Sequence, residues 1–493
     1  MSLTFTETPL TRPAHDWLRS IYVAYAPGAT TPVLDEVARG LFDRFSRMGH
    51  HVQDRPDDRV ELLVTTAPFG EPLGWREAVL FTCRRRFNLT HTPTVYSLIH
   101  VTPAQLQERL DYFRAALAKD SPDPADFALP GLAPSAHRAL IEQGRRGGPI
   151  LALVRQLQAQ SKSIRIILVV GDDHPEAAYY FDLVGAHPRI EAMQPDFFYT
   201  DMVLRVATSV STNEVTKHEV RPDVIPREVW ETLMTPRAMQ TAGRQLGERQ
   251  FFTEMIRVAD MVHVPSISEA VADQYSEGCF ATWDPQINGL IATVTGSARP
   301  VAKDNLTEDE LAVIVGVRPD GLGAVVRHVE RKRNDSPSSE AVELMDMDYA
   351  LPRIALGPEW GLEANAPVVR SKLHGHRGIA AYDPEQVEFV HLDAPYYHYP
   401  VSCSTEAQAR AIKAAFRRSE ALQDPNDPRQ VVFTVLPGHG IVVVEKWMAG
   451  KAPFQVLWEH MDAGFVRVAN DVPQGPLDFV PGPEGMRVLK AEQ

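Results

Sequence analysis

Cysteine is scarce in this sequence, and the few cysteines do not form a framework. The 493 residues include three, Cys83, Cys279 and Cys403, and no two of them form a CxxC pair. An odd, scattered set of thiols suits a reducing compartment, whereas small secreted domains carry dense sets that pair. A disulfide-stapled fold is therefore not expected, and we expect a cytoplasmic protein.

Long apolar runs are also missing. No run approaches the roughly 18 residues that a membrane-spanning helix needs. The opening stretch, MSLTFTETPL, lacks the basic start and the apolar core of a secretory leader. We therefore expect neither membrane insertion nor export.

Excess positive charge and nucleotide-binding motifs are absent as well. The formal net charge of −14 argues against nonspecific binding to nucleic acid. No GxGxxG opens a helix and no GxxxxGK[ST] occurs, so dinucleotide and P-loop binding have no motif support. With 44% hydrophobic and 23% charged residues, the composition is that of an ordinary globular protein. A small molecule is the partner that we expect.

The length of the chain exceeds what one hydrophobic core usually fills, so two domains are expected. The first half alternates strand-like and helix-like stretches, which predicts an α/β domain with a Rossmann-like parallel sheet. Its role is not readable. The segment Gly171–His174 follows an apolar strand, where open α/β sheets bind ligands, but ordinary turn residues account for the same pattern.

Two histidines with one residue between them are the most informative feature of the second half. His374 and His376 lie on a predicted strand, and His439 lies in a turn that leads into another strand. Side chains at i and i+2 of a strand point to the same face, so both rings can reach one ion. Three neutral imidazoles suit zinc and leave a coordination position open for substrate. Alternatively, these are ordinary half-buried residues in a chain with 17 histidines.

Four motifs occur in a particular order around this pattern. A Thr-Gly-Ser turn at 295–297 leads through KDNLTEDE to an apolar strand, and Pro-Ser-Ser-Glu follows at 337–340. The His-Gly-His strand and the HGIVVVE segment come next. In order and character, this series resembles the class II aldolase/adducin family, which includes fuculose phosphate aldolase. The resemblance covers about half of the chain.

The resemblance implies a fold and a set of residue roles. The C-terminal domain is expected to be a class II aldolase-like α/β/α fold with a mainly antiparallel central sheet. Glu340 matches a carboxylate that binds metal or transfers a proton. The resemblance also implies an oligomer of identical subunits. The metal ligands would be His374, His376 and His439, and the groups that bind an anionic substrate end would be Thr295, Gly296, Ser338 and Ser339.

The sequence departs from the family pattern at two places. Gly278-Cys279-Phe280-Ala281 stands where the family has Gly-Asn-x-Ser, which removes two polar groups that would hold a phosphate. The interval between Glu340 and His374 is longer than usual and is interpreted as an inserted loop. Pro-Ser-Ser-Glu has a second interpretation as a helix N-cap, and a capped helix N-terminus is itself able to bind an anion.

These residue types allow a specific chemistry. A divalent ion, zinc above all, would polarise the carbonyl of a hydroxyketone or ketose and stabilise an enediolate, while Glu340 moves the proton. The substrate would be a small sugar or sugar phosphate. The same site could cleave a carbon–carbon bond, epimerise a carbinol or expel water, so aldolase, epimerase and dehydratase stay open. A catalytically inactive interaction module on the same scaffold is the alternative from another class.

The predicted division of the chain follows from these segments. Residues 1–240 form the α/β domain of unknown role, and residues 241–470 form the aldolase-like, metal-dependent domain. Residues 471–493 are rich in proline and glycine and form a tail.

Overall fold

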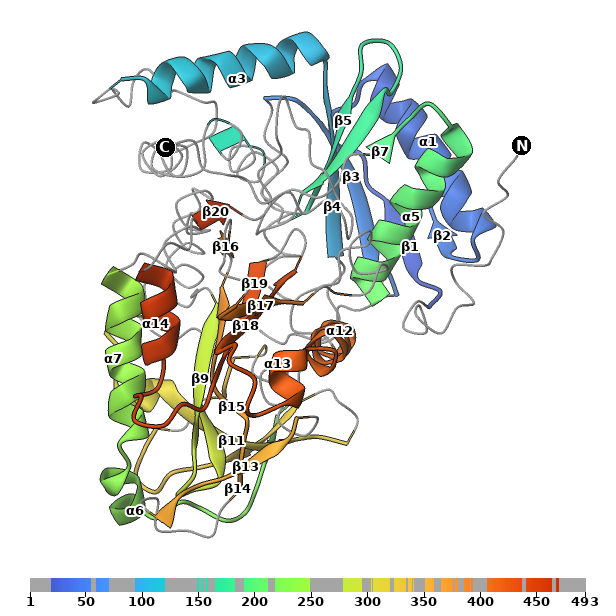
Figure 1. The fold of residues 1–493 in the computed structure, drawn as a ribbon. Helices are drawn as coiled ribbons and strands as arrows, with labels where there is room; N and C mark the ends of the chain where they lie inside the picture. The colour runs from blue at the N-terminus through green and yellow to red at the C-terminus, as the bar shows by residue number, and fades with distance from the viewer. Residues whose placement is uncertain are drawn as a thin grey trace.

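The protein is a mixed α/β structure built on two large sheets (Figure 1). In chain order, the amino-terminal strands and helices form the first sheet and its cover, and the later elements form the second. The computed structural model describes residues 19–54, 59–70, 94–119, 149, 152–153, 157, 165–181, 190–211, 218–248, 278–294, 303, 305–319, 323–333, 336–338, 340, 351–358, 365–375, 377–379, 385–390, 392, 406–436, 440–462 and 467–469.

The first sheet has the order β2-β1-β3-β4-β5-β6-β7. Its first five strands pair in parallel, and the last two pairings are antiparallel. The prediction of a parallel-rich sheet in the first half is confirmed. The strands are β1 (Tyr22–Tyr25), β2 (His51–Gln53), β3 (Leu62–Pro68), β4 (Thr94–Val101), β5 (Ile166–Val170), β6 (Ala177–Phe181) and β7 (Ile190–Glu191).

Helices pack against both faces of this sheet. α1 (Pro32–Arg47) and α5 (Pro195–Ser211) share one apolar cluster with it, and α3 (Pro103–Leu117) contributes to another. The sequence determines where α1 begins, because the side chain of Thr31 accepts a hydrogen bond from the Leu34 N–H and proline follows the cap.

The second sheet is mainly antiparallel and has the order β17-β18-β19-β15-β9-β10-β11-β12-β8, with parallel pairs at its two edges. A short 3-10 helix, η3 (Glu308–Glu310), leads into β11. The strands are β8 (Glu219–Val220), β9 (Cys279–Asp284), β10 (Gly289–Thr293), β11 (Leu311–Val317), β12 (Ala324–Arg327), β15 (Val369–Gly375), β17 (Val387–Phe389), β18 (Val431–Leu436) and β19 (Gly440–Lys446). Two small pairs are β13 (Arg353–Ala355) with β14 (Asn365–Pro367), and β16 (Arg377–Ile379) with β20 (Arg467–Ala469).

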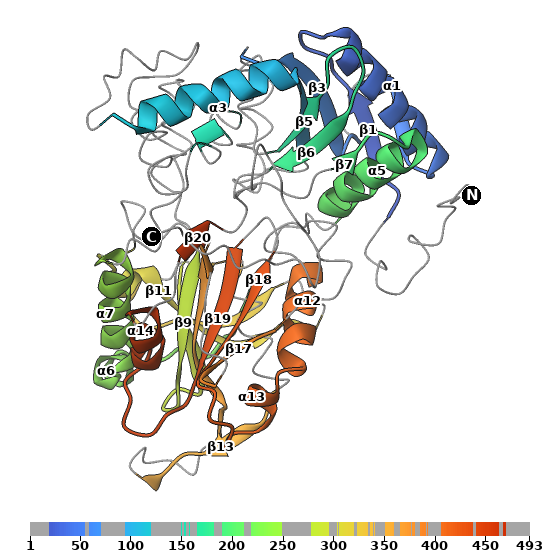
Figure 2. The ribbon, with the colours of Figure 1, turned by 45° about the horizontal axis from the view of Figure 1, so that its top comes forward.

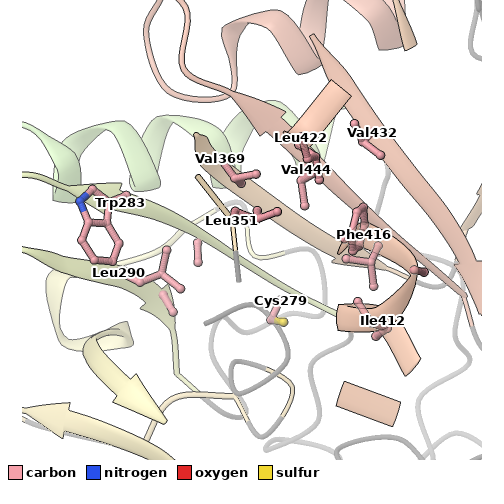
Figure 3. Close-up of a cluster of buried hydrophobic side chains, with 14 of the residues drawn as sticks. Cys279, Trp283, Leu290, Leu351, Val369, Ile412, Phe416, Leu422, Val432 and Val444 are labelled. Carbon is pink, nitrogen blue, oxygen red and sulfur yellow. The ribbon is translucent and has the colours of Figure 1, made fainter. Parts of the chain in front are cut away.

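Helices cover both faces of the second sheet (Figure 2). One face packs against α6 (Arg227–Thr232), α7 (Thr235–Glu248) and α14 (Gln455–Asp462). The other face packs against α12 (Glu406–Arg417) and α13 (Glu420–Gln423). The cluster on this second face joins Cys279 of β9 to Ile412 and Phe416 of α12 (Figure 3).

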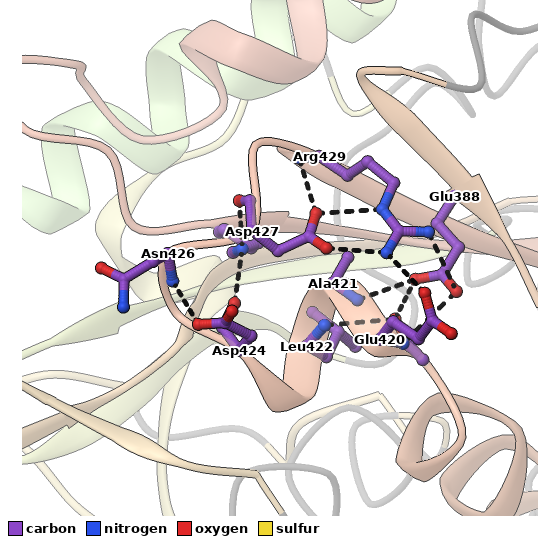
Figure 4. A network of polar contacts seen from close by, with 10 residues as sticks. Glu388, Glu420, Ala421, Leu422, Asp424, Asn426, Asp427 and Arg429 are labelled. Carbon is purple, nitrogen blue, oxygen red and sulfur yellow. Dashed lines mark hydrogen bonds and ion pairs between the residues drawn. The ribbon is translucent and has the colours of Figure 1, made fainter.

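A polar network fixes the edge of this sheet next to α13 (Figure 4). Arg429 makes a two-pronged contact with Asp427, at 2.9 and 2.7 Å, and also reaches Glu388 and Glu420. The guanidinium lowers the pKa of the Asp427 carboxyl to about 2. Glu388 accepts a hydrogen bond from the Ala421 N–H, so the network ties β17 to the start of α13.

Chain upstream of residue 240 takes part in the second sheet. β8 pairs with β12, Ile225 bridges to Val329, and Trp230 packs into the cluster around α7. The predicted division at residue 240 stays a prediction, but the segment 218–240 contacts the later part of the chain. Among the described residues, none of the helices combines the length and apolar character needed to cross a membrane.

Candidate functional site

The site is built on β15, which lies near the middle of the nine-stranded sheet with β19 on one side and β9 on the other. Every residue of β15 is buried. Leu373 packs into the cluster beneath α7 and α14, so by alternation Lys372 and His374 face the opposite side. The predicted strand is thus present up to Gly375, and its His374 side chain is fully buried.

Cys279 lies directly beside His374. The two residues are paired across β9 and β15, and both are fully buried. Residues directly opposite one another in an antiparallel pair place their side chains on the same face, with Cβ atoms about 5 Å apart. The segment that departs from the family pattern therefore lies within the candidate site.

Glu340 completes a group of three side chains. Its Oε1 lies 3.3 Å from His374 Nε2, and its Oε2 accepts a long hydrogen bond of 3.9 Å from the Cys279 thiol. The residue Glu340 is 8% exposed, although it lies far from both strands in the sequence. Glu340 therefore contacts the strand that carries His374.

The orientation of the His374 ring determines which nitrogen faces Glu340. Nδ1 lies 3.0 Å from the carbonyl oxygen of Ile441. A carbonyl oxygen only accepts, so Nδ1 carries the proton, and in the neutral ring Nε2 carries a lone pair. Nε2 then faces a carboxylate oxygen at 3.3 Å, and two acceptors at that distance need a proton or a cation between them. Metal-bound histidines commonly show the same carbonyl contact at their outer nitrogen.

The Pro-Ser-Ser-Glu segment lies next to the end of β10. The Ser338 N–H donates to the carbonyl oxygen of Thr293 at 3.0 Å, and Pro337 forms an isolated bridge with Val294. Pro337 and Ser338 are therefore held beside the end of β10, which Val294 and Thr295 follow in the chain. The structure thus brings the flanks of two predicted motifs together.

Several predicted site residues fall outside the described ranges, so their placement stays a prediction. Residues next to two of them are described. Gly375, which precedes His376, pairs with Ile441, and Gly440, which follows His439, pairs with Leu436. Within the ranges that are described, no three His, Cys, Asp or Glu side chains are arranged to hold a metal. The predicted residues concerned are His376, His439, Thr295, Gly296 and Ser339.

Sequence reasoning missed two neighbours of the site. In the sequence, Cys279 marks only the loss of phosphate-binding groups, and nothing there indicates its contact with Glu340. Lys372 is fully buried on the same face as His374, two residues earlier on β15. The period-two rule applied backwards from His374 would have placed Lys372 on this face, whereas the pairing of Cys279 with His374 has no signal in a single sequence.

Another buried carboxylate in the sheet has a structural role. Glu445 accepts hydrogen bonds from the Phe454 and Leu457 N–H groups, at 2.9 and 2.8 Å, and from the Ser371 hydroxyl at 3.0 Å. Burial raises the pKa of the Glu445 carboxyl, and these hydrogen bonds oppose that rise. Its oxygens hold the start of α14, on the face opposite to His374.

Comparison with known proteins adds no identification. The chain matches no protein-family model, no curated protein and no solved structure.

Proposed function

We propose that the protein is a metal-dependent, aldolase-type lyase that acts through an enediolate on a small hydroxyketone or ketose. The observation that carries the proposal is the contact of Glu340 with Nε2 of His374. The other ring nitrogen, Nδ1, is held by the Ile441 carbonyl. The ion would be zinc or a related divalent metal, held by His374, His376 and His439. The departure at Cys279 favours a substrate that does not depend on a phosphate group.

The chemistry of the described residues fits such an ion. Imidazole nitrogen binds zinc, so His374 would be one of the residues that hold the ion, and the positive charge would also stabilise the nearby Glu340 carboxylate. When bound, the ion would supply Lewis-acid polarisation of the substrate carbonyl.

The protein residues would then supply proton transfer and orientation. Glu340 would take a proton from the substrate and return it. Its carboxylate contacts both members of the buried His374–Cys279 pair. Ser338 would present its hydroxyl to the anionic end of the substrate, together with Thr295, Gly296 and Ser339. The apolar cluster around Cys279 would keep bulk water away from the reacting atoms.

Metal content tests the core of this proposal. Purified wild type, loaded with zinc and desalted, is compared with the His374→Ala variant by elemental analysis. We expect bound zinc in the wild type and a loss of at least tenfold in affinity in the variant. His174→Ala is the matched control, because His174 is an exposed histidine that contacts Glu36. Equal zinc content in wild type and His374→Ala would reject the assignment.

A turnover screen tests the reaction class. Ketose phosphates and free ketoses are incubated with zinc-, manganese- or cobalt-loaded protein, and the products are analysed by NMR. We expect cleavage products, and a fall of about 10²–10⁴-fold for Glu340→Gln, which removes the proton-transfer group. Epimers or dehydrated products would instead assign the other enediolate reactions, and an interaction module would convert none of the substrates.

The proposal also includes the fold of the two domains that the two sheets form. The order β2-β1-β3-β4-β5 of the parallel strands is one of the common doubly wound orders, which supports a Rossmann-like first domain. The mainly antiparallel second sheet between two helical layers supports an aldolase-like second domain. We also propose that the enzyme is cytoplasmic and forms a homo-oligomer, which sedimentation or light scattering would measure.

A further inference from the structure

We propose that His218 is a positioning residue for Glu340. His218 lies far upstream in the sequence, immediately before β8, and contacts the loop that carries Glu340. Its role in catalysis rests on the proposed function, but its role in placing the loop does not. Neither the histidine pattern nor the motif order singles it out.

The ring of His218 bridges two backbone groups. The Ala324 N–H donates to His218 Nδ1 at 3.1 Å, so Nδ1 is the acceptor nitrogen. The proton of the neutral ring is therefore on Nε2, which donates to the carbonyl oxygen of Pro337 at 3.2 Å. Burial and the nearby Arg318 lower the pKa of His218, which favours the neutral ring that this bridge requires.

One end of the bridge is rigid. Ala324 is fully buried at the start of β12, and β12 is paired with β11 on one side and β8 on the other. His218 thus links β12 to Pro337 through two hydrogen bonds, and this link restrains the position of Pro337. Proline has no N–H, so its carbonyl is the backbone group through which this residue can be held.

The second fixed point follows at the next residue. The Ser338 N–H donates to the Thr293 carbonyl at the end of β10. Ser338 is therefore held directly by β10, and Pro337 is held through the His218 ring by β12. Glu340 follows two residues after Ser338. Loss of the His218 contact would free Pro337 and let the carboxylate move from its place beside His374.

A pair of substitutions separates the two ends of the bridge. In His218→Gln, the amide N–H₂ takes the place of ring Nε2 and keeps the donor to Pro337. In His218→Asn, the side-chain oxygen takes the place of Nδ1 and keeps the acceptor for Ala324 but loses the donor. A positioning role predicts that Gln is tolerated and Asn is not. A role confined to strand β12 predicts the reverse.

Two readouts on the full chain decide between these roles. The first is hydrogen exchange of the Ser338 amide, and the second is zinc affinity by competition with a chromophoric chelator. For His218→Asn we expect Ser338 exchange to rise about tenfold or more and zinc affinity to fall about tenfold, the usual size for a supporting contact. For His218→Gln we expect both to stay within about threefold of wild type. Any other ranking of the two variants overturns the proposal.

A measurement on the wild type covers the case in which a variant does not fold. The ¹⁵N chemical shifts of the His218 ring report its tautomer, and the proposal requires the proton on Nε2. A proton on Nδ1 would overturn it without any substitution. If wild type binds no zinc, the proposed metal-dependent function fails, while Ser338 exchange and the His218 tautomer still test the positioning role.

Discussion

At the scale of single residues, hydrogen bonds to the backbone select one tautomer at two histidines, the fully buried His374 and the half-buried His218. His374 and His218 are both fixed by backbone groups, His374 through a carbonyl and His218 through an N–H and a carbonyl. Backbone N–H and C=O groups do not titrate, so each neutral ring has one preferred tautomer. The fold therefore determines which ring nitrogen of each histidine donates and which accepts.

His50 gives a pH prediction at this scale. It is 8% exposed and accepts a hydrogen bond from the Ile21 N–H at Nδ1, and burial lowers its pKa from 6.5 to about 4. The unfolded chain therefore binds the proton more readily, and stability falls as the pH drops from 6.5 towards 4. We expect a loss of about 3 kcal/mol across this window. Urea unfolding at a series of pH values measures it.

His50→Asn is the control for this prediction. The amide oxygen of Asn can accept the Ile21 N–H as Nδ1 does, but it does not titrate. Stability of this variant should depend less on pH between 6.5 and 4 than that of the wild type. Equal slopes would show that other groups dominate acid unfolding.

The sequence predicts the chemistry-bearing residues of the site better than their surroundings. His374 follows from the period of a strand, and Glu340 from the order of motifs. The contacts of Cys279 and His218 depend on long-range strand register and on a loop crossing, and no local pattern encodes these. His218 also lies upstream of the predicted boundary at residue 240 and belongs to none of the motifs.

At the scale of elements, buried polar groups connect strands to helix ends. Glu445 on β19 is the strongest case, because one carboxylate serves the two N–H groups at the start of α14 and the Ser371 hydroxyl on β15. The sequence predicts β19 from its apolar run. It does not predict that the final acid of that run is turned inwards to hold a helix.

Removal of the Glu445 carboxylate should therefore destabilise α14. Glu445→Ala removes the acceptor of the buried Leu457 N–H and leaves the Phe454 N–H with only the Ser371 hydroxyl at 3.2 Å. An unsatisfied buried donor costs about 1–3 kcal/mol, so we expect a loss of about 3 kcal/mol. Glu459→Ala is the control, since Glu459 on the same helix forms an exposed pair with Lys451 and should contribute little. Urea unfolding measures both, and similar losses in the two variants would contradict the assignment.

At the scale of the whole molecule, residues 218–240 precede the predicted boundary but contact the second sheet and its helices. The rhythm of strands and helices predicts two sheets of different character, and both are present. It does not locate the change from one to the other, because β8 has two residues and Ile225 and Trp230 carry no periodic pattern. Their partners are on β12, the following loop and η3.

Fragment length gives the prediction at this scale. Residues 212–493 should fold more stably than residues 241–493, because the shorter fragment loses β8, the Ile225–Val329 bridge and the buried Trp230. Loss of a buried tryptophan alone is of the order of 3–5 kcal/mol. Thermal unfolding of both fragments checks this. Equal melting temperatures would mean that these contacts add little and that the division at 240 is adequate.

The position of β15 has a consequence for any ion that the protein takes up. This strand is hydrogen bonded along both edges, and the His374 ring is held by a neighbouring strand. The imidazole is therefore already immobile in the ion-free protein, and its rotational freedom was lost when the chain folded. An arriving cation would meet a donor that needs no rearrangement, so capture at this ring should be governed by diffusion.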